Sequence, residues 1–145
     1  MKAAAVIAFV LFASLFARAE TKDLPVTAPG GVKAAGPAKV FEGPEGEEII
    51  MVEANDSKFM LVQFKNIAGF EGTKLYNLDD QGSEKKDLYW ERKRGSKTER
   101  RFVMSMRGGT WTFYHPVKNT EFSVSYSKKE SKKVKAEDIV STYKP

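Results

Sequence analysis

Hydrophobic residues from Val40 onward recur in short alternating runs, and clusters of Gly, Asp, Asn and Ser separate these runs. Alternation with a period of two, interrupted by turn-forming residues, is typical of β-strands. The pattern predicts eight strands, over residues 39–42, 48–54, 58–67, 73–78, 87–94, 97–107, 110–115 and 120–127. Residues 135–143 fit either a short helix or a last strand. We therefore expect an all-β protein.

The strand predicted over residues 58–67 is hydrophobic on both sides at its start. Phe59 and Leu61 point to one side, and Met60 and Val62 point to the other. A strand of this kind is typically central and covered on both faces. This predicts a single-domain antiparallel β-sandwich or a small β-barrel of about eight strands, with enough residues for one core. The sequence does not distinguish these two architectures.

Two glycine-led bends set the expected register of residues 87–115. Gly95-Ser96 fits a type II′ hairpin turn, and Gly108-Gly109 fits a second tight turn. Because side chains alternate across a strand, one face is predicted to form the core. That face would hold Tyr89, Phe102, Met104, Met106, Trp111, Phe113 and His115. The opposite, outward face would hold Leu88, Trp90, Val103 and Tyr114, bordered by Arg92, Arg101, Ser105 and Thr112.

This outward face combines aromatic rings with basic side chains. Residues 91–101 contain six basic and two acidic side chains. An aromatic ring can stack on a sugar or a base while basic groups meet phosphate, sulfate or carboxylate. Alternatively, another segment covers this face and Arg101 stacks on Trp90 as an internal cation–π pair. The candidate binding residues are Trp90, Arg92, Arg94, Lys97, Arg101 and Tyr114.

The N-terminal residues have the layout of a secretory signal peptide. Lys2 precedes an apolar run, and Ala17-Arg18-Ala19 fits a cleavage site. We expect a signal peptide over residues 1–19, cleavage near Ala19, and a secreted or periplasmic protein. No second apolar stretch that could form a transmembrane segment follows. Residues 20–39, rich in Ala, Pro and Gly, are predicted to be a flexible linker, and residues 40–145 the β domain.

Charge is distributed unevenly along the expected mature chain. It has 22 basic and 19 acidic residues, a net charge of +3. Besides residues 91–101, the segment 128–135 has five basic residues and one acidic residue. Such clusters attract anionic partners, although a basic run is also compatible with a loop that is merely solvated.

The sequence contains no recognised catalytic or metal-binding motif. It has no cysteine, and therefore no disulfide or thiolate nucleophile, and it has no nucleophile elbow or phosphate-binding glycine loop. Its one histidine, His115, is expected to be a buried structural residue rather than a metal ligand. Residues 79–84 place acidic side chains around a glycine without the spacing of a calcium loop. We expect no enzyme activity, no cofactor and no metal.

These observations predict a non-enzymatic binding domain. Its expected partner is an anionic polysaccharide, another envelope component or an acidic protein surface, with residues 87–115 and 128–135 as contact regions. Charge reversal at Arg92, Arg94 and Arg101 should then weaken retention on an anionic matrix. The alternative function is a small β-barrel that carries a lipophilic ligand, because Phe and Met are abundant.

Overall fold

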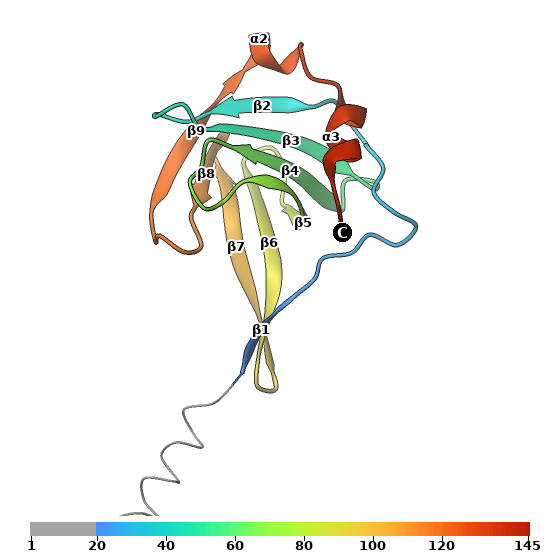
Figure 1. The fold of residues 1–145 in the computed structure, drawn as a ribbon, viewed down its shortest axis with the longest axis vertical. Helices are drawn as coiled ribbons and strands as arrows, with labels where there is room; N and C mark the ends of the chain where they lie inside the picture. Colours follow the sequence, from blue (N-terminus) through green and yellow to red (C-terminus); the bar gives the residue numbers. More distant parts are fainter. Residues whose placement is uncertain (1–19) are drawn as a thin grey trace, which may run out of the picture.

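The computed structural model describes residues 20–145 (Figure 1). The signal peptide predicted over residues 1–19 lies outside the described residues. The strands are β1 (Thr21–Leu24), β2 (Lys39–Glu42), β3 (Glu48–Ala54), β4 (Phe59–Lys65), β5 (Gly72–Asp80), β6 (Lys85–Arg94), β7 (Lys97–Arg107), β8 (Thr110–Tyr114) and β9 (Glu121–Ser127). Two short helices follow, α2 (Lys128–Ser131) and α3 (Ala136–Thr142). All eight predicted strands are confirmed with ends shifted by at most two residues, and residues 135–143 contain a helix.

The sheet closes on itself into an eight-stranded antiparallel barrel. Strands β2 to β9 pair in chain order, and β9 returns to pair with β2, with Val40 opposite Ser127. Closure gives every barrel strand a neighbour on both sides, although Gly72 to Tyr76 of β5 pair only with β4. The architecture is therefore the small barrel, not the sandwich. Strand β1 is the ninth strand and pairs with the end of β6, with Lys22 opposite Lys93.

The barrel has one hydrophobic core inside and a second on its outer surface. In β3, Ile49 and Met51 belong to the inner core, whereas Ile50 and Val52 belong to the outer one. Helix α3 covers the outer core with Ala136 and Ile139, and it lies beside β3 and β4 in Figure 1. This explains why the sequence of β4 is hydrophobic on both sides.

The segment of residues 20–39 differs from the predicted flexible linker. It contains β1, and it packs Val26, Ala28, Val32 and Ala34 against the outer core. Asn55 fixes the segment further, because its side-chain oxygen accepts a hydrogen bond from the Lys33 backbone N–H (2.8 Å) and its amide donates to the Gly31 carbonyl (2.8 Å). The high content of Ala, Pro and Gly is typical of a linker, but here the alanines and valines of the segment pack against the outer core.

The register of the β6–β7 hairpin corrects the predicted assignment of faces. Pairing is as predicted between Tyr89 and Phe102 and on to the turn, where Gly95 has φ +61°. Beyond that pair a β-bulge at Val103 places Leu88 opposite Met104. A bulge adds one residue to one strand and reverses which of its side chains face inward. Val103 and Leu88 are consequently fully buried, whereas Phe102 is 46% exposed.

The second turn behaves as predicted. Gly108 and Gly109 have φ +58° and +83°, and Met106 pairs with Trp111. The inward side chains confirmed as buried are Met104, Met106, Trp111, Phe113 and His115. Of the seven predicted core residues, Tyr89 and Phe102 were assigned wrongly, and the bulge is the reason.

Candidate functional site

One end of the barrel opens into a cavity of about 660 Å³. This is the end at which β2, β4, β6 and β8 begin. The interior side chains that line the cavity are Phe41, Met51, Met60, Met106 and Trp111. The volume lies within the range of small-molecule sites, roughly 300–1,000 Å³. Methionine is a suitable lining residue because its unbranched, polarizable side chain adapts to ligands of different shape.

Charged side chains surround the mouth of this cavity. Lys39, Glu53, Asp80 and Lys86 are among its lining residues. The Lys86 ammonium lies 2.6 Å from the Asp80 carboxylate. Hydrogen bonds from Lys86 and from the Gly82 backbone N–H lower the pKa of Asp80. The mouth thus carries both signs of charge above an apolar interior.

Aromatic rings fill the opposite end of the barrel. The Phe64 and Phe70 rings lie 4.8 Å apart between centroids, and each lies within 5.5 Å of the Phe113 ring. Phe122 packs on Phe113 at 5.3 Å. This aromatic packing lies at the end opposite the mouth of the methionine-lined cavity.

His115 completes the closed end as a structural residue. Its Nδ1 accepts hydrogen bonds from the backbone N–H groups of Val117 (3.2 Å) and Lys118 (3.1 Å). Nε2 therefore carries the proton and donates to the Ala68 carbonyl (3.1 Å). His115 is 6% exposed, and its hydrogen bonds connect the loop at Ala68 to the loop at Val117 and Lys118. This burial agrees with the structural role expected from the sequence.

Five of the six predicted binding residues share one face of a three-stranded ribbon. The ribbon consists of β1, the end of β6 and the start of β7, and it projects from the barrel (Figure 1). Trp90, Arg92 and Arg94 alternate along β6, while Arg101 and Lys97 lie opposite Trp90 and Arg94. Because of the bulge, this face continues the inner face of the barrel instead of its outer face.

The sixth predicted residue, Tyr114, lies apart from the other five. Its neighbours in the chain, Phe113 and His115, are buried in the interior, so alternation turns Tyr114 to the outside of β8. Tyr114 lies opposite Glu121 of β9 on the outer side of the wall, whereas Trp90 packs against the inner core. The predicted grouping of Tyr114 with Trp90 is therefore wrong.

Along the ribbon face, the basic side chain at the base contacts other residues of the protein, whereas those at the tip are exposed. At the base, Arg101 lies over the half-buried Trp90 ring at 5.2 Å and donates a hydrogen bond to the Pro116 carbonyl (3.0 Å). Midway, Arg92 lies 3.8 Å from Asp23 of β1. At the tip, Arg94 and Lys97 face each other and are exposed. The base thus forms the stacked Arg101–Trp90 pair that was the alternative interpretation of this face.

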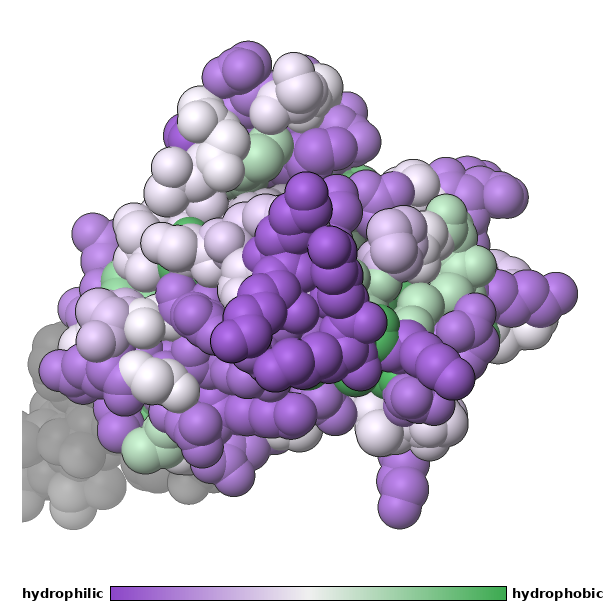
Figure 2. Space-filling model, turned by 90° about the horizontal axis from the view of Figure 1, so that it is seen from above, coloured by the Kyte–Doolittle hydropathy of each residue, from purple (hydrophilic) through white to green (hydrophobic). Residues whose placement is uncertain are grey.

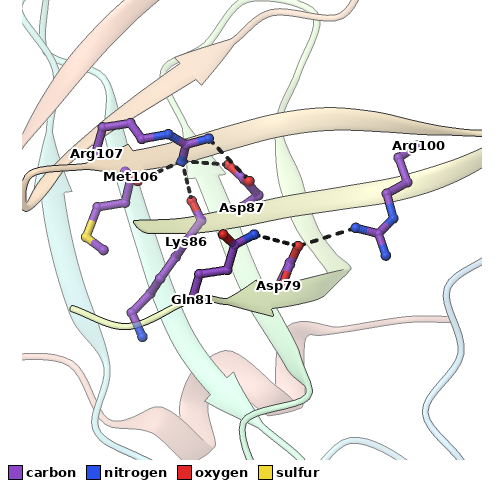
Figure 3. A network of polar contacts seen from close by, with 7 residues as sticks. All are labelled: Asp79, Gln81, Lys86, Asp87, Arg100, Met106 and Arg107. Atoms are coloured by element: carbon purple, nitrogen blue, oxygen red, sulfur yellow. Dashed lines mark hydrogen bonds and ion pairs between the residues drawn. The ribbon is translucent and has the colours of Figure 1, made fainter. Parts of the chain in front are cut away.

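Ion pairs connect β5, β6 and β7 on the outer face of the barrel wall (Figure 3). Arg107 donates to both carboxylate oxygens of Asp87, at 2.9 and 3.3 Å, and Arg100 donates to Asp79 at 3.3 Å. Burial of Asp87 opposes its ionisation, but hydrogen bonds from Arg107 and Ser105 outweigh burial and lower its pKa. These ion pairs connect basic residues of β7 to acidic residues of β5 and β6.

The Lys-rich segment 128–135 forms α2 and the turn after it. Lys128, Lys129, Lys132 and Lys133 are exposed, and Lys133 pairs with Glu130 at 3.0 Å. Seen from above, where α2 lies, the surface is predominantly hydrophilic with smaller hydrophobic areas beside it (Figure 2). These lysines are exposed at the surface, and they line neither the open-end cavity nor the cavity beside Trp90.

The sequence did not identify the cavity residues as a site. Met51, Met60 and Met106 come from three strands, and only barrel closure brings them together. The sequence signal was weak, because Met51 lies in the middle of β3, Met60 near the start of β4 and Met106 near the end of β7. The abundance of Met and Phe is compatible with a lipophilic interior, but it does not indicate which of these residues line it.

Comparison with known proteins adds no relative. The chain matches no protein-family model, no curated protein and no solved structure. Within residues 20–145, no helix has the length and apolar character needed to cross a bilayer. In the same part of the chain, no three acidic or histidine side chains come together as a metal site.

Proposed function

We propose that this protein binds a small lipophilic molecule with a polar end group in the open end of its barrel. The observation that carries the proposal is the cavity of about 660 Å³ lined by three methionines, Phe41 and Trp111. Eight-stranded barrels have an interior that can hold one small ligand. The apolar part of the ligand would lie among the methionines, and its polar end would meet the charged mouth.

In this proposal the protein acts by binding, not by catalysis, after export from the cytoplasm. The mixed charges of Lys39, Glu53, Asp80 and Lys86 favour a neutral or zwitterionic end group over a strongly charged one. A medium-chain fatty alcohol is therefore a suitable probe. Ligand binding to the folded state should raise the melting temperature, and this rise should be insensitive to salt.

The blocking variant for this test is Gly36→Phe. Gly36 lines the cavity, its φ is outside the left-handed region, and a Cβ built on it meets no atom within 4 Å. The phenylalanine ring can therefore occupy the cavity without strain in the wall. Ser125→Phe is the matched control, because it adds the same ring at an exposed position that does not line the cavity.

The expected result is a rise in melting temperature with the fatty alcohol for the unsubstituted protein and for Ser125→Phe, and a much smaller rise for Gly36→Phe. Equal responses of all three proteins would contradict binding in the cavity. The same conclusion would follow if no chain length of alcohol raised the melting temperature.

A second candidate function is recognition of an anionic polymer or an acidic protein surface by the ribbon. The specific observation in its favour is that Arg94 and Lys97 lie together, exposed, at the tip of a projecting hairpin. In this proposal Arg92 and Arg101 extend the basic face toward Trp90, and the exposed lysines of residues 128–135 add a separate contact.

Reversal of the two tip charges, Arg94→Glu with Lys97→Glu, tests this second function while leaving the Trp90 base intact. The variant should elute from a heparin matrix at lower salt than the parent, because fewer ionic contacts form. Lys33→Glu with Lys58→Glu is the control, since it changes the net charge equally at exposed sites away from the ribbon. If both double variants elute alike, only net charge matters and the ribbon is not a specific contact.

A further inference from the structure

We propose that a second cavity, at the base of the ribbon, binds a small planar organic carboxylate. This cavity has a volume of about 510 Å³, and its walls include Phe70, Lys74, Tyr76, Trp90 and Arg101. None of these five residues lines the open-end cavity. The proposal is therefore independent of the lipophilic ligand proposed above.

The course of β6 creates the second cavity. Its first half pairs with β5 as far as Tyr89 and Asn77, and its second half pairs with β1 instead. The first residues of β5, from Gly72 to Tyr76, have no partner in β6. The ribbon thus separates from the barrel wall, and Asp23 to Val26 cross beside the opening.

Tyr76 provides a hydrogen-bond donor that the described residues leave unused. The residue is 3% exposed, and its hydroxyl has no hydrogen-bond partner among residues 20–145. Buried hydroxyl groups almost always have a partner, so an exception calls for an explanation. Burial raises the pKa of Tyr76 well above its ordinary value, which keeps the hydroxyl protonated and able to donate. An acceptor oxygen of a ligand would satisfy it.

Two cations give the cavity its preference for an anion. The guanidinium of Arg101 has five N–H donors, and its hydrogen bond to the Pro116 carbonyl uses one of its terminal nitrogens. The Lys74 ammonium lies 4.9 Å from the centre of the Phe70 ring. The acidic residue at the cavity, Asp23, is 3.8 Å from Arg92. A carboxylate is the matching group for a guanidinium and a hydroxyl donor.

Aromatic rings define the rest of the ligand. The centroids of the Trp90 and Tyr76 rings lie 6.0 Å apart, and Phe70 contributes a further ring to the cavity. Planar rings pack favourably in offset or edge-to-face arrangements on such side chains. The ligand class is therefore a ring system that carries one carboxylate.

The two tryptophans make the two cavities separately observable. Trp90 lines the ribbon cavity and Trp111 lines the open-end cavity, and the chain has no other tryptophan. In Trp111→Phe, naphthoate should quench the fluorescence of Trp90 in a saturable manner. Naphthamide, which has the same ring system without the charge, should bind at least about tenfold more weakly.

Two substitutions test the polar contacts. Tyr76→Phe and Arg101→Gln should each weaken naphthoate binding by about tenfold. Tyr76→Phe should leave the melting temperature without ligand unchanged or higher, because the hydroxyl it removes has no partner in the protein. Arg100→Gln is the control, because Arg100 lies on the opposite face of the same strand and stacks on Tyr89. It should bind naphthoate normally.

The proposal fails if Trp90 shows no saturable quenching at millimolar naphthoate, if naphthamide binds equally well, or if Tyr76→Phe binds like its parent. The indole N–H resonances of Trp90 and Trp111 in the unsubstituted protein give a second measurement should Trp111→Phe not fold. A naphthoate-induced shift of Trp111 alone would support the open-end cavity and overturn this one. Binding of the fatty alcohol without binding of naphthoate would likewise support the open-end cavity and overturn the proposal for the ribbon cavity.

Discussion

The two ends of the barrel are built from the same eight strands but are filled differently. At the closed end, Phe64, Phe70, Phe113 and His115 meet ring against ring. At the open end, the side chains at equivalent inward positions include three methionines, and a cavity of about 660 Å³ remains among them. The number of strands fixes the diameter of the interior, but the residue types decide whether it is packed or hollow.

This difference suggests a division of labour between stability and binding. Rigid aromatic rings that contact one another leave no room to rearrange, so the closed end should contribute most of the folding free energy. Methionines specify a packing arrangement poorly, which suits a surface that must adapt to a ligand. Substitutions at the two ends should therefore change different properties.

The largest effect on stability should come from Phe113→Ala. Phe113 is fully buried and contacts Phe64, Phe70 and Phe122, so its removal leaves a cavity in the closed end. We expect a loss of about 3–5 kcal/mol in the free energy of unfolding, measured by urea denaturation. A loss below about 1 kcal/mol would show that the closed end is not the rigid part of the barrel.

His115→Ala should have the next largest effect. It leaves the backbone N–H groups of Val117 and Lys118 without their acceptor and the Ala68 carbonyl without its donor. The free energy of unfolding should fall by roughly 1–3 kcal/mol. Lys118→Ala, at an exposed side chain, serves as the control and should be neutral. Equal stability of the two variants would argue against the histidine as a connection between loops.

Asp87→Asn tests the ion pair with Arg107 on the outer face of the wall, which contributes to the packing of neither interior end. The pKa of Asp87 is lowered in the folded state, so its contribution to stability is complete above the pKa of the unfolded chain and disappears as pH falls through the folded pKa. At neutral pH the variant should lose about 1–2 kcal/mol. Thermal melts from pH 7 down to about pH 2 should show this difference shrinking below about pH 4. A difference that does not depend on pH would contradict the account.

The smallest effect on stability should come from Met106→Leu at the open end. The two side chains have similar volume, so the free energy of unfolding should change by less than about 1.5 kcal/mol. The affinity for the fatty alcohol should change nonetheless, because Met106 lines the cavity. Isothermal titration calorimetry with the fatty alcohol measures this affinity. The control is Phe102→Leu, at a partly exposed position outside the cavity. Equal affinities would remove Met106 from the site.

Local patterns predicted the strands and turns because alternation and turn chemistry are properties of neighbouring residues. Barrel closure depends on the pairing of Val40 with Ser127, which no local pattern encodes. The bulge at Val103 was also invisible, because Val103 and Met104 are both hydrophobic and either can face inward. One inserted residue was enough to place Trp90 and Arg101 on the inner side. The sequence therefore identified a real cluster but assigned it to the wrong face.

Contact quenching can show whether the open end of the barrel holds a lipophilic ligand. A bromine-tipped fatty alcohol quenches only a tryptophan that it touches, so Trp90→Phe and Trp111→Phe separate the two reporters. The account predicts strong, saturable quenching of Trp111 in Trp90→Phe and little quenching of Trp90 in Trp111→Phe. Quenching of neither tryptophan, or equal quenching of both, would contradict it.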